Sequence, residues 1–329
     1  MPIRNEAAFV ASSLNAVLGQ DYPTRLMEVI VADGVSTDDT REIVQSLQSE
    51  NPNLRLIDNG RKIVASGLNA AVGQASGEII VRVDGHCRIA PDYVRRCVEH
   101  LLNDGVDCVG GPLHTIGETS LAQVVAVAMS SPFGVGDSAF RTLSDKTMLT
   151  DTVAFPAYNR SIMDLAGPFD EELVRNQDDE YNYRIRRLGA KVLLASDVQS
   201  EYYGRTALRS LWRQYFQYGY WKVRVMQKHP LQMRPRQFVP PTFVTALLIS
   251  MLLAPLSAAG RWSLFLVGGS YILANLVATA LTARKLAWRQ LALLPLVFAI
   301  LHLAYGLGFL TALLRFWNRW WDRETRNGI

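Results

Sequence analysis

The sequence predicts an α/β domain of the open, ligand-binding kind, followed by helices that cross a membrane. Three observations lead to this fold class. Short apolar runs alternate with helical segments in the first half of the chain, two of these runs end in an aspartate, and three long apolar stretches follow. Alternating strands and helices build sheets with parallel strands, and about 20 consecutive apolar residues suffice to cross a bilayer.

Composition narrows the class of protein. Hydrophobic residues make up 49% of the 329 and concentrate after Arg236, and the basic residues gather around positions 205–236 and from Arg315 onwards. The net charge of +4 is small, and this placement of the basic residues suits anionic lipid headgroups better than a nucleic acid. The three cysteines lack metal-site spacing, and no leading apolar segment resembles a signal peptide. We therefore expect the first half to lie in a reducing cytoplasm.

The first predicted strand-to-helix unit starts with an apolar run at residues 28–32 that ends at Asp33. Residues 36–38, which are Ser, Thr and Asp, then supply capping side chains for a helix that runs through Leu47. A strand is expected before this unit, yet residues 2–6 read as the exit from a strand that is almost absent, since strands usually have about five or six residues. We expect the natural start to lie upstream, with a tolerated short strand as the alternative.

A second unit follows, with a strand at residues 54–57, a helix at 65–74 and a strand at 78–83 that leads into Asp84. Open α/β sheets bind ligands outside the carboxyl ends of their strands, so Asp33 and Asp84 are expected to face one crevice. Either aspartate alone is more simply explained as a turn or a helix cap. Their joint placement favours a site, because an acid that ends a strand can hold a divalent cation on a phosphate.

A second acidic cluster, Asp178, Asp179 and Glu180, opens a predicted helix. Crowded carboxylates can raise the proton affinity of one member, which then serves as a base. Attraction to the helix dipole is the structural alternative and explains the composition equally well. That alternative leaves the neighbouring loop at residues 167–171 unexplained.

Aromatic and basic side chains alternate at helical spacing over residues 208–225, which favours a helix at a membrane surface over a packed core helix. The apolar stretches run over residues 238–259, 262–283 and 291–314. By the positive-inside rule, the basic loop at residues 284–289 should be cytoplasmic, whereas a third crossing places the arginines of the tail outside, against the same rule. We favour three spans; a re-entrant or interfacial last segment is the alternative.

The order of the motifs resembles that of family 2 glycosyltransferases. The motifs are Pro2-x-Arg4-Asn5-Glu6, Val31-Ala32-Asp33-Gly34, Gly67-Leu68-Asn69, Val83-Asp84-Gly85-His86, Gly167-Pro168-Phe169-Asp170-Glu171 and Gln177-Asp178-Asp179-Glu180. The resemblance covers about residues 1–225. Within the family, the Asp-Gly-His triplet and the Asn-Gln-Asp-Asp-Glu string look most like bacterial exopolysaccharide glycosyltransferases of the succinoglycan-biosynthesis type.

This resemblance implies a GT-A fold, a nucleotide-diphosphate sugar donor and inversion at the anomeric carbon. By position, Asp33 matches the acid that contacts the nucleotide base, and Asp84 the first acid of the metal-binding element. His86 stands where that element has its second acid, so it is expected either to bind the divalent metal directly or to hydrogen-bond a phosphate or a bound water. The metal is Mn²⁺ or Mg²⁺, and an imidazole ligand suits Mn²⁺ better. Glu6 and Arg61 complete the implied nucleotide-sugar site, although a solvated basic residue is the simpler interpretation of Arg61.

The same resemblance implies that Asp178 is the base for an acceptor hydroxyl, with Asp179 and Glu180 as its nearest rivals. Asp170 and its neighbour Glu171 are candidates for shaping the acceptor site. The segment Tyr158-Asn159-Arg160 offers a further set of groups for acceptor hydroxyls or phosphate.

We therefore expect three regions: a GT-A catalytic domain over residues 1–205 with a truncated first strand, an interfacial helix region over 206–236, and a transmembrane region over 237–329 with a basic tail. The expected activity is transfer of a sugar, glucose from UDP-glucose by family analogy, to a polyprenyl-diphosphate-linked saccharide in exopolysaccharide biosynthesis. The expected location is the inner (plasma) membrane, as a multi-pass protein with a cytoplasmic catalytic domain. The alternatives are a polyprenyl-monophosphate glycosyltransferase and a non-catalytic scaffold of a polysaccharide assembly.

Overall fold

The computed structural model describes residues 1–204 and 207–320, without the side chains of residues 285 and 289. The chain divides into two compact units. The first contains Met1–His114 and Ala139–Tyr203, and the second contains Thr115–Ser138 and Gly204–Ile329. The predicted boundary at residues 205 and 206 and the part of the predicted basic tail beyond residue 320 lie outside the described residues.

This division differs from the predicted continuous domain over residues 1–205, because Thr115–Ser138 groups with the second unit. The segment carries the helices α5 (Ser120–Met129) and α6 (Pro132–Val135). The apolar face of α5 packs against α14 (Leu294–Arg315), a helix that comes much later in the sequence. The local sequence pattern does not reveal that α5 packs against a helix so far away in the sequence.

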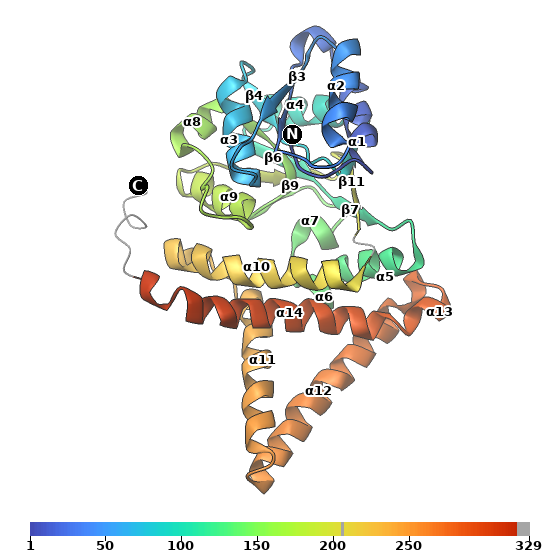
Figure 1. Ribbon diagram of the computed structural model, residues 1–329, viewed down its shortest axis with the longest axis vertical. Coiled ribbons are helices and arrows are strands. Elements are labelled where there is room, and N and C mark those ends of the chain that lie inside the picture. Colours follow the sequence, from blue (N-terminus) through green and yellow to red (C-terminus); the bar gives the residue numbers. More distant parts are fainter. Residues whose placement is uncertain (205–206, 321–329) are drawn as a thin grey trace. The chain divides into compact units, whose positions relative to one another are not determined.

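Strands and helices alternate at the start of the first unit, as predicted (Figure 1). The strands form sheets of order β1-β2-β3, β4-β9-β6-β10-β8 and β5-β11-β7. Their bounds are β1 (Pro2–Ile3), β2 (Val29–Asp33), β3 (Leu54–Asp58), β4 (Ile79–Val81), β5 (Cys87–Ile89), β6 (Cys108–Gly111), β7 (Leu113–Ile116), β8 (Met148–Leu149), β9 (Ala154–Asn159), β10 (Val192–Leu194) and β11 (Ser200–Tyr203).

The helices of the first unit include the predicted ones, shifted by a few residues at their ends. Their bounds are α1 (Val10–Leu18), η1 (Thr24–Leu26), α2 (Thr40–Glu50), α3 (Val64–Gln74), α4 (Tyr93–Asn103), α7 (Ala139–Thr142), α8 (Arg160–Ala166) and α9 (Gln177–Arg187). β2 is buried at every position, as expected for an apolar strand covered on both faces. In the parallel register Ile3 pairs with Asp33, and Asp33 with Asp58, so the carboxyl ends of β1, β2 and β3 lie level.

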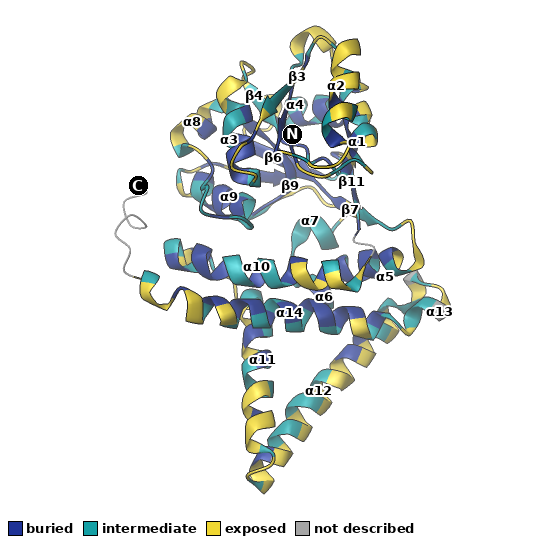
Figure 2. Ribbon diagram, in the orientation of Figure 1, coloured by how far each residue is buried: buried dark blue, intermediate teal, exposed yellow. Residues whose placement is uncertain are grey.

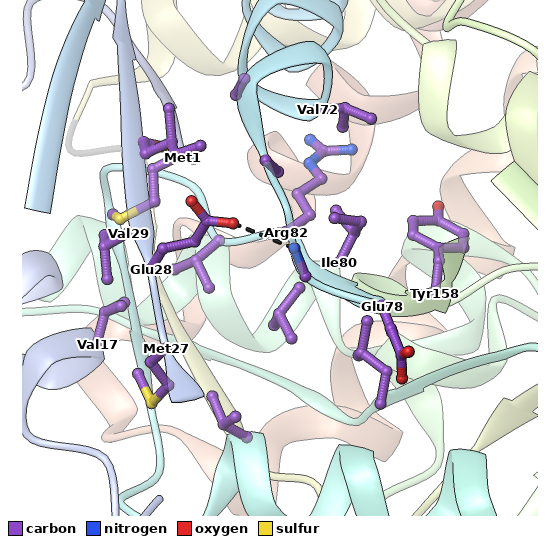
Figure 3. A pocket seen from close by; sticks show the side chains of 18 of the residues that line it. Met1, Val17, Met27, Glu28, Val29, Val72, Glu78, Ile80, Arg82 and Tyr158 are labelled. Atoms are coloured by element: carbon purple, nitrogen blue, oxygen red, sulfur yellow. Dashed lines mark hydrogen bonds between the residues drawn. The ribbon is translucent and has the colours of Figure 1, made fainter. Parts of the chain in front are cut away.

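An apolar cavity of about 400 Å³ separates β2 from β4. Figure 3 shows Met1, Val17, Met27 and Val29 along one wall, with Ile80, Arg82 and Tyr158 among the residues of the other. Near its rim the Glu28 carboxylate accepts hydrogen bonds from the backbone N–H groups of Ser76 (2.5 Å) and Gly77 (3.2 Å). Asp84, His86 and Asp178 do not line this cavity; of the acidic site described below, Arg82 is the residue that also lines it.

The second unit is helical in its described residues. Besides α5, α6 and α14 it contains α10 (Leu208–Lys228), η2 (Pro230–Gln232), α11 (Pro235–Leu253), α12 (Ala258–Thr282), η3 (Ala283–Lys285), α13 (Trp288–Leu291) and η4 (Trp317–Arg319). The predicted surface helix corresponds to α10, and the three apolar stretches correspond to α11, α12 and α14. By length and composition, these last three are each able to cross a membrane.

Figure 1 shows α10 and α14 side by side, while α11 and α12 form a hairpin that leads away from them. Glycines permit the close approach of α10 and α14. A Cβ on Gly219 would overlap the backbone of Tyr305, and a Cβ on Gly308 would overlap the backbone of Phe216. The two helices therefore meet backbone to backbone, with no room for a side chain at these points.

Candidate active site

The centre of the candidate site is a buried arginine between two aspartates. Arg82 follows β4, and its guanidinium donates to both carboxylate oxygens of Asp84, at 3.1 and 3.3 Å. The third nitrogen of the same fork lies 3.7 Å from Asp178 Oδ2 at the start of α9. The Arg82 side chain is 8% exposed, and its guanidinium points away from Glu78 (Figure 3). Two acids far apart in the sequence are thus joined through one cation.

Electrostatic interactions keep both Arg82 and Asp84 in their charged forms. Burial by itself raises the pKa of Asp84, but the positive charge of Arg82, with a smaller contribution from His86, outweighs that effect and lowers the pKa below its ordinary value. Burial likewise lowers the pKa of Arg82, while the charges of Asp84 and Asp178 raise it further, so its net pKa is above the usual range. Asp84 is therefore a carboxylate at neutral pH.

The acids of α9 have different surroundings. The Asp178 side chain is 42% exposed, and its Oδ1 accepts from the Asp179 N–H at 3.0 Å. Both oxygens of Glu180 accept from Arg184 at 3.0 Å in a pair that is almost fully buried. Asn176 precedes the helix in the left-handed conformation, with φ of 64°. Of the three predicted acids, Asp178 contacts the arginine that binds Asp84, whereas Glu180 serves an internal ion pair.

His86 lies beside the aspartate pair. Its Nδ1 is 2.9 Å from Glu6 Oε1, and its ring makes an edge contact with Tyr202. Within the described residues no group of three or more His, Cys, Asp or Glu side chains is arranged to hold a metal ion. Asp84 and His86 offer one carboxylate and one imidazole. That donor chemistry fits a divalent ion such as Mn²⁺ that also binds the oxygens of a diphosphate.

The loop after β2 holds the predicted nucleotide-binding aspartate. Asp33 is fully buried, and its carboxylate accepts from the Ser36 hydroxyl at 2.5 Å and from Arg41 at 3.3 Å. Asn5, from the loop after β1, accepts from the Thr37 N–H at 2.9 Å, so the two loops are tied together. Val35 has φ of 57°, a conformation that is rare and costly for a β-branched residue. Such strain is typical of functional loops.

The loop at residues 167–171 is fixed to α3. The Asn69 side chain donates to Phe169 O at 2.9 Å and accepts from Phe169 N at 2.8 Å, and it also donates to Glu171 at 2.9 Å. Glu171 in turn forms an ion pair with Arg61. The structure therefore pairs Arg61, predicted to contact the donor, with the loop predicted to shape the acceptor site. Asp170 accepts from the Glu172 N–H at 2.9 Å, which makes it a turn residue in this state.

The acceptor contacts considered for Tyr158, Asn159 and Arg160 do not match the structure. Tyr158 is buried and donates to Asn182 at 3.0 Å, while Asn159 and Arg160 donate to backbone carbonyls. Sequence reasoning also assigned no role to Arg82. The available signal was a charged residue inside an apolar strand, two positions before Asp84 and therefore on the same face of that strand.

Comparison with known proteins identifies the family of the chain. Residues 1–163 match the model of glycosyl transferase family 2. The chain is 31% identical over 238 residues to succinoglycan biosynthesis protein ExoA of Rhizobium meliloti, an alignment that covers 70% of this chain and 69% of that protein. It is 24% identical over 236 residues, or 69% of this chain and 73% of the relative, to a dolichyl N-acetyl-alpha-D-glucosaminyl phosphate 3-beta-D-2,3-diacetamido-2,3-dideoxy-beta-D-glucuronosyltransferase of Methanococcus voltae.

Among solved structures, the mannosyltransferase PcManGT of Pyrobaculum calidifontis, in complex with GDP-Man and Mn²⁺, has a TM-score of 0.58 and 20% identity. The match covers 98% of this chain and 86% of that one. The fold and the family match define the class as a GT-A glycosyltransferase. The chain belongs to glycosyltransferase family 2.

Proposed function

We propose that this chain is a membrane-anchored, inverting glycosyltransferase that moves a sugar from a nucleotide diphosphate to a lipid-linked saccharide in exopolysaccharide biosynthesis. The link through Arg82 between Asp84, at the end of the strand, and Asp178, at the start of α9, carries the proposal. The relatives support the acceptor class, since one is named for succinoglycan biosynthesis and another for a dolichyl-linked sugar. UDP-glucose is the donor that we propose by analogy with the family.

In this proposal Asp178 is the base. Its carboxylate removes the proton from an acceptor hydroxyl, whose oxygen attacks the anomeric carbon of the donor sugar. The bond between that carbon and the diphosphate breaks, and the nucleoside diphosphate leaves with the electron pair. The helix dipole of α9 stabilises the Asp178 carboxylate, which opens that helix and remains partly exposed to an incoming hydroxyl.

The other end of the site receives the diphosphate. Asp84 and His86 would hold a divalent ion, and when bound this ion neutralises the charge that develops on the leaving diphosphate. Arg82 keeps the Asp84 and Asp178 carboxylates at a fixed separation, because one planar guanidinium contacts both. Asp33 and Glu6 are proposed to contact the nucleotide sugar, with Asp33 acting from the loop that Ser36 and Arg41 hold in place.

The test is sugar transfer by the full chain in liposomes, with Mn²⁺, a panel of radiolabelled nucleotide sugars and extracted lipid-linked saccharides. Asp178→Asn should lower kcat by about 10²–10⁴, the usual contribution of a general base, without weakening nucleotide binding. Asp179→Asn is the matched control, because it removes the neighbouring charge from the same helical turn, and it should retain most of the activity.

Three results would contradict the proposal. Loss of activity in Asp179→Asn but not in Asp178→Asn would transfer the role of base to Asp179. A labelled lipid product in which the new sugar is linked to phosphate, and not to another sugar, would indicate a polyprenyl monophosphate acceptor. Retention of nucleotide binding without transfer from any donor would favour the scaffold.

A further inference from the structure

The three apolar helices of the second unit differ in what covers them. Figure 2 shows α11 and α12 with long exposed stretches; 17% of the apolar window of α11 and 11% of that of α12 are buried, against 50% for α14. The exposed large apolar side chains of α11 and α12 are Phe238, Val239, Leu248, Ile249, Met251, Leu252, Leu253, Trp262, Phe265, Leu266, Ile272, Leu273, Leu276, Val277 and Leu281. On α14 the exposed large apolar side chains are Leu296 and Leu314, near its two ends. Other parts of the protein therefore cover most of the apolar surface of α14, whereas α11 and α12 leave theirs exposed.

The partner of α14 along its length is α10. The two helices run in the same direction, because Gly219 of α10 lies against Tyr305, and the Gln227 side chain further along donates to Phe316 O at 2.8 Å. Val223 packs between these points, against Phe309 and its neighbours on α14. Since they pack side by side over this distance, α10 and α14 share one depth in any membrane.

That depth cannot be the hydrocarbon core, because α10 carries exposed cations. Its basic residues are Arg209, Arg213, Lys222, Arg224 and Lys228. Lys222 and Arg224 are buried within the protein, whereas Arg209 and Arg213 are exposed. A single arginine at the centre of a bilayer costs about 2.5–3.5 kcal/mol even on the mildest scale. Aromatic residues mixed with cations, as on α10, are typical of a helix in the headgroup region.

We propose that the α11–α12 hairpin alone crosses the membrane, and that α14 lies beside α10 in the near headgroup region. The 19 residues of α11 and the 25 of α12 span about 28 and 37 Å at 1.5 Å per residue, against a hydrocarbon thickness of about 30 Å. Residue 320 then lies on the same side of the membrane as every residue before α11.

The distribution of charge supports two crossings. Arg234 precedes α11 and Arg236 lies in its first turn, the cations at positions 284, 285 and 289 follow α12, and Arg315 and Arg319 lie at and just after the end of α14. With two crossings all of them lie on one side, and Arg261, next to the hairpin turn, is the cation of the described residues placed on the other. Three crossings would divide the clusters, against the positive-inside rule. The lipid bilayer is the partner of the exposed α11 and α12 surfaces.

Cysteine labelling of the full chain in membrane vesicles tests this topology. The native Cys87, Cys97 and Cys108 are fully buried, which keeps the background low. Single cysteines are introduced by Leu26→Cys before the hairpin, Leu256→Cys in its turn and Trp317→Cys after α14, at side chains that are 64%, 78% and 72% exposed. An impermeant maleimide is applied to right-side-out and to inverted vesicles, and detergent-solubilised protein gives full labelling.

Two crossings require that Leu26→Cys and Trp317→Cys react in the same vesicle preparation and Leu256→Cys in the opposite one. Reaction of Trp317→Cys on the side opposite to Leu26→Cys would overturn the inference, because α14 would then cross. Protection of Leu256→Cys in both preparations would also overturn it, because the hairpin would not reach the far side. Neither result depends on transferase activity, so failure here is distinguishable from failure of the proposed reaction.

Discussion

At the scale of single residues, Arg82 determines the spacing of the Asp84 and Asp178 carboxylates in the candidate site. A guanidinium has five donors in a rigid fork, so it can bind Asp84 through two bonds and still face Asp178. A lysine in its place would keep the charge but not this geometry. The two carboxylates repel each other without a cation between them, which makes their spacing dependent on this one side chain.

Arg82→Met should lower the free energy of unfolding by about 3–5 kcal/mol, because it leaves the Asp84 carboxylate buried without its partner. Arg88→Met is the matched control, since Arg88 on β5 forms an exposed pair with Glu201 on the adjacent strand β11, and such a pair contributes about 1 kcal/mol or less. Thermal unfolding of the purified full chain gives both values. Equal stability of the two variants would contradict a structural role for the Arg82 pair, and Arg82→Lys should fall between Arg82→Met and wild type.

The sequence places Asp84 after a strand and Asp178 at the start of a helix, and the structure brings both to Arg82, while their roles in the reaction stay predictions. The sequence was not sufficient to select Arg82, because whether a charged residue in a strand is buried depends on strands that pair with it from elsewhere in the chain. Tyr158 shows the reverse error. Its place on the approach to the acidic cluster suggests a contact with the acceptor, yet its hydroxyl donates to Asn182 in the interior.

At the scale of elements, His100 joins the end of α4 to the segment between β10 and β11. One ring nitrogen is 2.6 Å from Asp104 Oδ2 and the other is 2.9 Å from Asp197 Oδ1. Burial lowers the pKa of His100, but the hydrogen bonds to Asp104 and Asp197 outweigh burial and raise it above 6.5. The charged form is therefore favoured in the folded protein.

This raised pKa predicts a pH dependence of stability. The contribution of His100 is complete below its unfolded pKa of about 6.5 and is lost as the pH rises through the higher folded value. His100→Gln should thus lower the melting temperature at pH 6 and have a smaller effect at pH 8.5, within the roughly 1 kcal/mol of a partly exposed pair. His114→Gln, at a histidine bonded to the uncharged Gln199, is the control. A His100→Gln effect that grows with pH would have the wrong sign.

The seam between α10 and α14 gives a prediction about packing. Gly308→Ala places a methyl group against the backbone of Phe216, which cannot move aside as a flexible side chain would. We expect a loss of about 1–3 kcal/mol, the usual cost of overpacking, seen as a lower melting temperature in detergent. Gly269→Ala on α12 is the control, because its Cβ would meet nothing within 4 Å. If both variants melted alike, the close approach of α10 and α14 would be absent in solution.

At the scale of the whole chain, hydropathy located α11, α12 and α14, but it does not distinguish an apolar helix that lipid covers from one that protein covers. An apolar helix has the same composition whether lipid or protein covers it, and the contacts of α14 with α5 and α10 join residues far apart in the sequence. The same limit applies to Thr115–Ser138, which lies between strands of the first unit in sequence and packs with the second. Local sequence patterns locate the helices and strands, while contacts between elements that are far apart in the sequence are known only from the three-dimensional structure.

The pairing of α10 with α14 also has a consequence for biosynthesis. A ribosome adds about 5–20 residues per second, so α14 is finished some 4–17 s after α10, with the α11–α12 hairpin made in between. Throughout that interval Leu211, Tyr215 and Val223 lack the apolar partner that later buries them. The nascent α10 must wait with that face against a lipid surface or a chaperone until α14 is translated and completes the layer begun by α5.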